Sequence, residues 1–268
     1  MQNNVLAMRA VVSLILGALT LFVSPQAHAG VLEATKERGI LVVGVREDFP
    51  PLGYLDANGK NTGFEVDLAR YLARQLLGDE SKLQLVPVLA ANRITTLHSQ
   101  STDLLIAAVT ATEDRTYVFA FSEPYFLSGT LLLVPRNSAI HDIGDVPGKR
   151  VAVLTGSIQE GSLQPVFPDA VRVRFWSVPE AIDALRAGRV DALAEDDVLV
   201  LALARQYPDL TAVGKPFHPH PYAIAMPKGD KELVAWVNDQ LQRAKADGTY
   251  NALWNKYFGQ DEALLLRP

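Results

Sequence analysis

Three polar side chains follow one short apolar run and have the chemistry to bind a carboxylate. Thr110, Thr112 and Arg115 come directly after residues 104–109. The carboxyl ends of strands in a parallel α/β sheet are where such folds present groups to a ligand. A guanidinium offers a planar fork of donors that suits a carboxylate better than an ammonium does. Arg115 is therefore a candidate anion-binding residue, although an exposed arginine at a helix start would look the same.

Gly156 and Ser157 lie where a second apolar run, residues 151–154, leads into a predicted helix. Backbone amides at such a point form a positive end that is rich in hydrogen-bond donors. They would suit a second contact with a carboxylate, and they would equally suit an ordinary helix cap. Both can hold at once, because Ser157 and Glu160 have the spacing of a capping box.

Apolar β-rich runs alternate with amphipathic segments along the chain, which is typical of an α/β fold with parallel strands and crossover helices. Strands are predicted at residues 40–45, 104–109 and 151–154, and an amphipathic helix at residues 64–76. The same order of elements restarts after a stretch rich in Pro, Asp and Gly at residues 135–149. This weak internal repeat predicts two similar lobes.

The tail at residues 230–258 predicts an amphipathic helix, a break at Gly248 and a short aromatic helix. Its pattern alone leaves open which lobe it joins. If the chain crosses between the lobes near Val134 and again near Met226, the tail returns to the first lobe and the molecule is a hinged clamp. The predicted division is then residues 30–134 and 227–268 for the first lobe, and 135–226 for the second.

Residues 1–29 predict an export signal that is removed from the mature chain. Arg9 is their only charged side chain, and the apolar run at residues 10–23 is too short to span a bilayer comfortably. The small residues Ala27 and Ala29 lie where a signal peptidase requires them. We therefore expect cleavage after Ala29 and a freely soluble periplasmic protein.

Composition argues against several kinds of partner and chemistry. Cleavage removes one of the 25 basic residues and none of the 30 acidic ones, so the mature chain has a formal charge of −6, which disfavours a nucleic-acid partner. Without cysteine there are no disulfides and no thiol chemistry. His218 and His220 could ligate a metal, but they lack a third ligand at a recognisable spacing, so a turn is favoured and neither metal nor cofactor is expected.

Five segments of the chain resemble, in order and spacing, the periplasmic amino-acid-binding proteins of ABC transporters, bacterial solute-binding protein family 3. The resemblance covers nearly all of the mature chain. It implies the type II periplasmic binding fold, in which two Rossmann-like α/β lobes joined by a two-segment hinge close around a small amino acid. It also implies a monomer that delivers this amino acid to the membrane permease of an importer, rather than an enzyme. The segments are residues 43–52, 63–68, 110–115, 121–125 and 248–257.

The resemblance assigns roles to individual residues. Arg115 matches the arginine that holds the ligand's α-carboxylate, and Asp196 matches the acid that binds its α-ammonium. Glu195 or Asp197 would replace Asp196 if the register slips. Phe49 matches an aromatic wall against the aliphatic part of the ligand. The predicted ligand-binding set is Arg46, Phe49, Arg93, Ala108, Thr110, Thr112, Arg115, Gly156, Ser157 and Asp196.

Arg46 and Arg93 resemble arginines of the glutamate/aspartate-binding branch of this family. Three arginines around one cleft would repel each other unless an anionic ligand bridged them. A dicarboxylic amino acid would do so, which favours glutamate or aspartate. The alternative is that Arg46 or Arg93 points to solvent or pairs with Glu47 or Asp48.

Two other functions are compatible with the same fold. Cyclohexadienyl dehydratases are exported enzymes whose chemistry needs a cleft acid that protonates a leaving hydroxyl, and Glu195 or Asp196 would be the candidates. The chain could also be the sensing partner of a receptor, which requires a separate signalling protein. An amine-binding acid together with a carboxylate-binding arginine favours binding over catalysis, although fold alone does not decide function.

Overall fold

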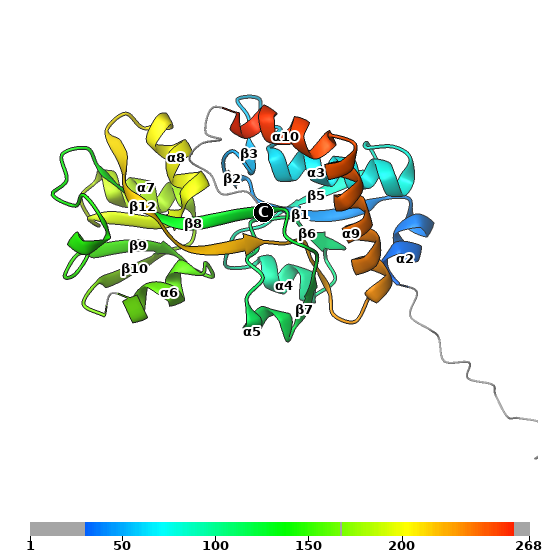
Figure 1. Ribbon diagram of the computed structural model, residues 1–268, viewed down its shortest axis with the longest axis horizontal. Coiled ribbons are helices and arrows are strands. Elements are labelled where there is room, and N and C mark those ends of the chain that lie inside the picture. The colour runs from blue at the N-terminus through cyan, green and yellow to red at the C-terminus, as the bar shows by residue number, and fades with distance from the viewer. Residues whose placement is uncertain (1–29, 167, 260–268) are drawn as a thin grey trace, which may run out of the picture.

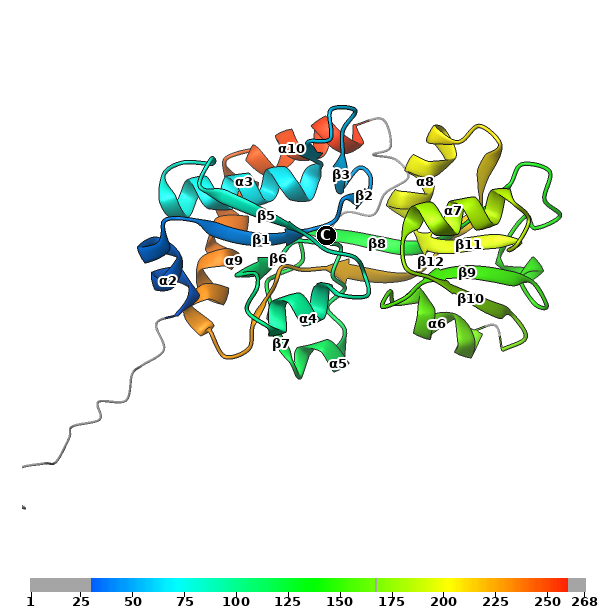
Figure 2. The same cartoon turned by 180° about the vertical axis from the view of Figure 1, so that it is seen from behind.

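The computed structural model describes residues 30–166 and 168–259, which form two lobes of α/β structure side by side (Figure 1). Each lobe contains one five-stranded sheet, and helices cover both faces of each sheet (Figure 2). The predicted α/β class is confirmed. The predicted export signal and residues 260–268 lie outside the described residues.

The sheet of the first lobe has the strand order β5-β1-β6-β13-β7. β1 pairs in parallel with β5 and β6, whereas β13 runs antiparallel to β6 and β7. A small sheet of β2, β3 and β4 lies beside it. The strands are β1 (Leu41–Val45), β2 (Asp48–Phe49), β3 (Gly53–Leu55), β4 (Asn61–Thr62), β5 (Leu83–Pro87), β6 (Leu104–Leu105), β7 (Phe119–Phe121) and β13 (Ala225–Pro227). The helices are α2 (Val31–Arg38), α3 (Phe64–Leu77), α4 (Arg93–His98), α5 (Glu113–Thr116), α9 (Lys231–Ala246) and α10 (Thr249–Phe258).

The sheet of the second lobe has the strand order β10-β9-β11-β8-β12. β9, β10 and β11 are parallel, and β8 runs antiparallel to β11 and β12. The strands are β8 (Phe126–Pro135), β9 (Arg150–Leu154), β10 (Val171–Phe175), β11 (Ala192–Asp196) and β12 (Leu210–Tyr222). The helices are η1 (Ile143–Asp145), α6 (Gln159–Val166), α7 (Val178–Arg186) and α8 (Asp197–Gln206).

β1 reads as a continuous apolar run because both of its faces are covered. Leu41, Val43 and Val45 are buried, as expected for a parallel strand between two layers of helices. Gly44 lets β6 approach closely, since a Cβ at this position would lie 2.5 Å from Cδ2 of Leu105. The predicted strand at the start of the fold is therefore confirmed.

β6 is shorter than the strand predicted at residues 104–109. Ile106 still donates its N–H to the Gly44 carbonyl of β1 at 3.0 Å, but at Ala107 and Ala108 the backbone bonds to side chains instead. Ala108 has a positive φ of 51°, its N–H donates to Oε1 of Glu65 at 2.7 Å, and its carbonyl accepts from Nη1 of Arg93 at 2.7 Å. These contacts take the place of strand pairing, and β6 ends at Leu105.

α9 and α10 confirm the predicted helix, break and aromatic helix of the tail. Gly248 separates them with a φ of 84°, a left-handed conformation that favours glycine. Tyr250, Trp254 and Phe258 of α10 pack on Phe64 of α3, with ring centroids 5.2 to 6.4 Å apart. The tail therefore completes the core of the first lobe.

Two chain segments connect the lobes. The chain passes from β7 of the first sheet to β8 of the second, and it returns from β12 to β13. β8 and β12 lie side by side (Figure 1), with Phe126 paired to Tyr222, and Thr110 forms a bridge to Tyr222. From this pairing we propose that the first crossing lies just before β8 rather than near Val134, and the second between Tyr222 and Ala225.

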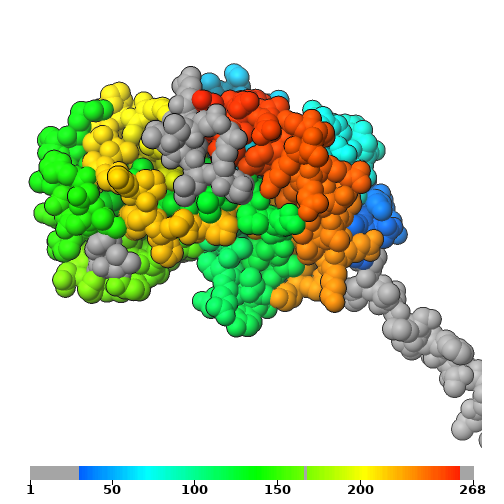
Figure 3. Space-filling model, viewed as in Figure 1, coloured from blue at the N-terminus to red at the C-terminus, as the bar shows by residue number. Residues whose placement is uncertain are grey.

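The two lobes are in direct contact. Nη2 of Arg115 in the first lobe donates to the carbonyl of Gly156 in the second at 3.1 Å, and the N–H of Val178 donates back to Oδ2 of Asp48 at 3.2 Å. A Cβ on Gly156 would lie 2.6 Å from the carbonyl oxygen of Ala90. Below the crossing strands, the surface is hollowed between the lobes (Figure 3). The structure is therefore a closed conformation with a groove on one side.

Candidate functional site

An enclosed cavity lies between the two lobes. Its volume is about 10 Å³, which is room for one water molecule. A wider groove of about 480 Å³ continues from it, and Thr110, Ser157 and Ile158 line both. Anything larger than water enters the enclosed part only when the lobes move apart. Its walls are Arg46, Phe49, Ala90, Arg93, Ala108, Thr110, Ser157, Ile158, Gln159, Glu195 and Asp196.

The structure brings the predicted ligand-binding residues to this one cleft. All of them except Thr112, Arg115 and Gly156 line the enclosed cavity. Thr112 and Arg115 line the groove, and Gly156 is joined to Arg115 by the hydrogen bond between the lobes. Sequence reasoning missed Gln159, which lies on the Asp196 side of the cavity. The roles of these residues toward a ligand stay predictions.

Arg115 is held at the mouth of the cleft by neutral partners. The side chain of Thr112 caps α5 and accepts from the Arg115 N–H at 3.4 Å. The guanidinium donates to the carbonyls of Thr110 at 2.9 Å and Gly156 at 3.1 Å. Burial lowers the pKa of Arg115, and the charge of Asp196 opposes that shift. Neither carbonyl carries a formal charge, so these bonds orient the guanidinium without neutralising it.

Arg93 is almost fully buried at the start of α4. Its Nη1 donates to the carbonyls of Ala107 at 2.5 Å and Ala108 at 2.7 Å, which orients the side chain along the cavity wall. Its Nε has no hydrogen-bond partner among the described residues. Burial, followed by the charges of Arg115 and Arg46, lowers the pKa of Arg93 to about 10. The buried guanidinium thus carries an unused donor, which is uncommon in a folded protein.

Arg46 already has a carboxylate partner, so the three arginines do not face one another with their charges unbalanced. Its Nε donates to Oδ1 of Asp48 at 2.8 Å, and its Nη2 lies 2.6 Å from the same oxygen. Its guanidinium lies over the ring of Phe49, 4.9 Å from the centroid. Asp196, whose pKa is lowered, also lines the same cavity. The premise that only an anionic ligand could offset the arginines is therefore wrong, because the protein itself supplies carboxylates.

Asp196 ends β11 and precedes α8, on the second-lobe side of the cleft. Its Oδ1 accepts from Nε2 of Gln159 at 2.8 Å and contacts Nε2 of His220 at 2.7 Å. Burial raises the pKa of Asp196, but hydrogen bonds and charge, first those of His220, outweigh it and leave the pKa lowered. Asp196 is therefore an ionised, buried carboxylate, and it borders the same cleft as the Arg115 guanidinium.

Glu195 is a second buried acid in the cavity wall. It is 1% exposed, and its Oε2 accepts from the backbone N–H of Asp196 at 2.8 Å. Burial, followed by the charge of Asp196, raises the pKa of Glu195 to about 8, while Arg46 and Arg93 act in the opposite direction. At neutral pH this carboxyl is mostly protonated, so it can donate a hydrogen bond into the cavity.

The amides of Gly156 and Ser157 do not present free donors in this conformation. The N–H of Gly156 donates to Oε2 of Glu160 at 2.8 Å, and that of Ser157 to the carbonyl of Leu154 at 3.1 Å. The Ser157 hydroxyl accepts from the Glu160 N–H at 3.4 Å. The expected cap is present, although the Glu160 carboxylate bonds to the N–H of Gly156 instead of that of Ser157. The Gly156 and Ser157 amides that were expected to bind a ligand carboxylate are therefore occupied.

Glu65 supports the cavity wall from behind and was not singled out by the sequence. It is fully buried in α3 and accepts hydrogen bonds from the Tyr125 hydroxyl and the Ala108 N–H. Burial raises the pKa of Glu65. The one sequence feature that pointed to Glu65 is its place in the family-like segment 63–68. An acidic residue in the first turn of an amphipathic helix is usually interpreted as exposed.

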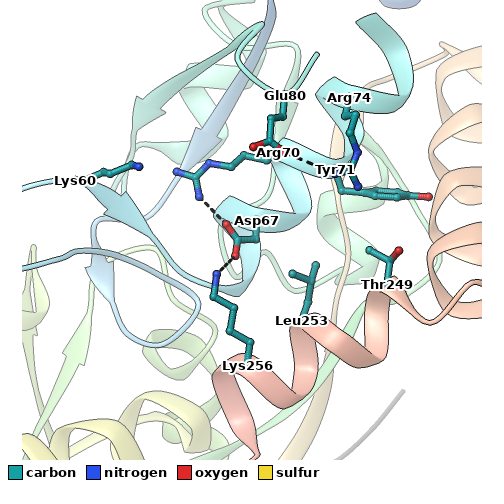
Figure 4. Close-up of a pocket in the computed structure, with 9 residues that line it drawn as sticks. All are labelled: Lys60, Asp67, Arg70, Tyr71, Arg74, Glu80, Thr249, Leu253 and Lys256. Carbon is teal, nitrogen blue, oxygen red and sulfur yellow. Dashed lines mark hydrogen bonds and ion pairs between the residues drawn. The ribbon is translucent and has the colours of Figure 1, made fainter. Parts of the chain in front are cut away.

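A second pocket, of about 370 Å³, lies on the outer surface of the first lobe between α3 and α10 (Figure 4). Asp67 is central to it and is bonded to Arg70 at 2.5 Å and to Lys256 at 2.6 Å (Figure 4), while Arg74 lies 3.7 Å from Glu80. Its charges largely pair with one another. We therefore assign the functional site to the cleft.

Comparison with known proteins agrees with this geometry. The profile of the "Bacterial extracellular solute-binding proteins, family 3" matches residues 41–260. The chain belongs to this family. Its solved members have the type II periplasmic binding fold, and the two α/β lobes described above match that fold.

Similar proteins are named for the amino acids that they bind. The "ABC transporter glutamine-binding protein GlnH" of Bacillus subtilis is 32% identical over 242 residues, 90% of this chain and 89% of that protein. The "L-cystine-binding protein TcyJ" of Escherichia coli is 36% identical over 239 residues, 88% of each. A structure of the solute receptors for L-cysteine of Neisseria gonorrhoeae is 34% identical with a TM-score of 0.83, covering 89% of this chain and all of that one. The chain is an amino-acid solute-binding protein.

The described residues contain neither a candidate membrane span nor a candidate metal site. None of the helices within residues 30–166 and 168–259 combines the length and apolar character that crossing a bilayer requires. Across the same part of the chain, His, Asp and Glu side chains do not gather in threes or more where a metal ion would fit.

Proposed function

We propose that this solute-binding protein captures a polar amino acid, with glutamate or aspartate favoured, in the periplasm and delivers it to the membrane permease of an ABC importer. One observation carries the proposal. The Arg115 guanidinium on the first lobe and the ionised Asp196 carboxylate on the second border the same cleft. They have the charges that a zwitterion's carboxylate and ammonium require.

Binding begins in an open state, because the closed cavity of about 10 Å³ cannot admit an amino acid. The first lobe offers Arg115 to the α-carboxylate, with its guanidinium already oriented by the Thr110 carbonyl. Closure then brings Asp196 to the α-ammonium and displaces water. Charged contacts strengthen as water leaves, since the local dielectric falls. The closed shape is what we propose the permease recognises.

The preference for an acidic side chain rests on two groups in the enclosed cavity. The buried Nε of Arg93 has no partner among the described residues, and a side-chain carboxylate would supply one. The raised pKa of Glu195, about 8, leaves that residue protonated at neutral pH. A neutral carboxyl donates to a ligand carboxylate instead of repelling it.

Glutamine is the second candidate, because Arg46 already pairs with Asp48. This ion pair reduces the positive charge that an acidic side chain would meet. A carboxamide oxygen could accept from Arg93, and its NH₂ group could donate to Glu195. Two relatives are named as glutamine-binding proteins.

The test is a thermal-shift screen of ligand-stripped protein against the L-amino acids, followed by calorimetry. A ligand present at a hundred times its Kd should raise the stability by about 2.7 kcal/mol. For a protein of this size that corresponds to a rise in Tm of roughly 5 to 10 °C. Glutarate, which has both carboxylates of glutamate and no ammonium, is the matched control and should give no comparable shift. An equal response to glutarate would contradict the role of Asp196.

A catalytic function is favoured by one observation, the protonated buried Glu195 in the cleft. A structure of the "ancestral amino acid-binding protein AncCDT-1, a precursor of cyclohexadienyl dehydratase" is 34% identical with a TM-score of 0.79. Incubation with prephenate and with arogenate tests this alternative. Formation of an aromatic product that is lost in Glu195→Gln would replace the binding proposal with a dehydratase.

A further inference from the structure

His220 is a buried side chain that contacts the predicted ammonium-binding carboxylate. It lies on β12, one of the two strands beside the connections between the lobes, and is 3% exposed. Its Nδ1 lies 2.8 Å from the carbonyl oxygen of His218, and its Nε2 lies 2.7 Å from Oδ1 of Asp196. Both ring nitrogens therefore face oxygen acceptors.

This geometry determines where the protons are. A carbonyl oxygen has no hydrogen to donate, so Nδ1 of His220 must carry one. A neutral imidazole with hydrogen on Nδ1 would present a lone pair from Nε2 to the carboxylate of Asp196. The contact at 2.7 Å is favourable only when one proton is shared between Nε2 and Oδ1. The pair consequently holds a proton in this closed conformation.

The groups around His220 favour its protonated form. Asp196 and Asp197 face it from the junction of β11 and α8, and Glu195 adjoins them in β11. On β12, His218 and Tyr222 are its neighbours, with the Tyr222 ring centroid 5.8 Å from that of His220, and Arg115 lies across the groove. Burial by itself lowers the pKa of His220, but the hydrogen bond and charge of Asp196, the His218 carbonyl and the charge of Asp197 raise it above its usual value.

We infer that the proton shared by His220 and Asp196 competes with the ligand's α-ammonium for this carboxylate, so that ligand affinity rises with pH as His220 deprotonates. The inference rests on the proposed function, in which Asp196 binds the ammonium. Gln159 and His220 both use Oδ1 of Asp196, which assigns Oδ2 to the ligand. An imidazolium and an ammonium on one carboxylate repel each other.

The direction of the pH dependence follows from the thermodynamic linkage between proton release and ligand binding. Ligand binding brings a second cation to Asp196 and lowers the pKa of His220, so binding releases a proton. Removing that proton beforehand, by raising the pH, must strengthen binding by the same factor. The association constant should rise by up to about tenfold per pH unit while His220 titrates, and then level off until Glu195 begins to ionise near pH 8.

The experiment measures affinity by calorimetry between pH 5.5 and 8.5 for the wild type, His220→Gln and His141→Gln. The probe is whichever of L-glutamate, L-glutamine and L-cystine gives the largest thermal shift. His220→Gln keeps a neutral donor, so below the pKa of about 8 of Glu195 its affinity should be nearly independent of pH and, near neutral pH, within about tenfold of the wild type. His141→Gln is the matched control, because His141 is exposed in the second lobe. It should reproduce the wild-type profile.

Several outcomes would overturn the inference. A wild-type affinity that does not change with pH would do so, as would a His220→Gln profile identical to the wild type. Glu195→Gln serves as a second comparison. If ligand affinity loses its pH dependence in Glu195→Gln but keeps it in His220→Gln, the titrating group is Glu195. If His220→Gln does not fold, NMR titration of the His220 ring in the wild type replaces that variant. The expected result is a His220 pKa above 6.5 that falls when ligand is added. A pKa that ligand does not change would refute the inference.

Asp196→Asn separates this inference from the proposed function. If Asp196→Asn binds the probe as tightly as the wild type, the assignment of Asp196 to the ammonium fails, and the inference fails with it. If Asp196→Asn loses binding while His220→Gln keeps the wild-type pH profile, only the role of His220 is wrong.

Discussion

Replacement of Arg115 by alanine is the most direct test of how the cleft holds a ligand. The substitution removes the guanidinium whose bonds, at 2.9 and 3.1 Å, go to carbonyls of both lobes. The ligand carboxylate would then be buried without its cation. Truncating one partner of a buried charge pair costs about 2 to 5 kcal/mol. At about 1.4 kcal/mol per tenfold, the Kd should rise by roughly 30-fold to several thousand-fold.

Calorimetric titration with the amino acid chosen in the screen measures this loss. Arg115→Lys keeps the charge but not the planar fork, so its affinity should lie between those of the wild type and the alanine variant. Arg186→Ala is the matched control, since Arg186 forms an exposed ion pair with Asp209 and such pairs contribute little. A Kd for Arg115→Ala within threefold of the wild type would refute the assignment.

Three further predictions concern the same cleft. Arg93→Ala should weaken glutamate and aspartate more than glutamine and asparagine in calorimetry, and equal losses would argue against an acidic pocket. Gly156→Ala should weaken binding by at least about tenfold, because the residue has a φ of 78° and its Cβ would lie 2.6 Å from the Ala90 carbonyl oxygen in the closed state. Small-angle scattering should show this variant in an open conformation. Gly161→Ala is the control, since a Cβ there would meet nothing within 4 Å. The ratio of glutamate to glutamine affinity should fall above pH 8 as Glu195 ionises, by up to about tenfold per pH unit, and Glu195→Gln should abolish that fall.

The sequence predicted the fold and the members of the site better than their contacts. Apolar periodicity located β1, α3 and the tail helices, because these elements bury a continuous face. Arg115 and Asp196 were predicted to share one cleft because α/β folds present ligand-binding groups at the carboxyl ends of strands, and because both residues match the family. The end of β6 was not predictable from an apolar run, since it depends on bonds from Arg93 and Glu65 that come from distant segments.

Side-chain partners were predicted least well, because they depend on geometry that spacing does not reveal. Arg46 pairs with Asp48, one of the alternatives that the sequence left open. The amides of Gly156 and Ser157 are used internally. His220 was interpreted as part of a turn, whereas the structure buries it in a strand against Asp196.

The order of strands in the first sheet has a consequence for biogenesis. β13 is inserted between β6 and β7, and α10 supplies the aromatic rings that cover Phe64. This half of the molecule cannot assemble until residue 258 has been synthesised. The other sheet is formed from the uninterrupted stretch of residues 126–222 and can assemble earlier. Synthesis from the N-terminus thus orders the folding of the halves, with the ligand cleft completed last.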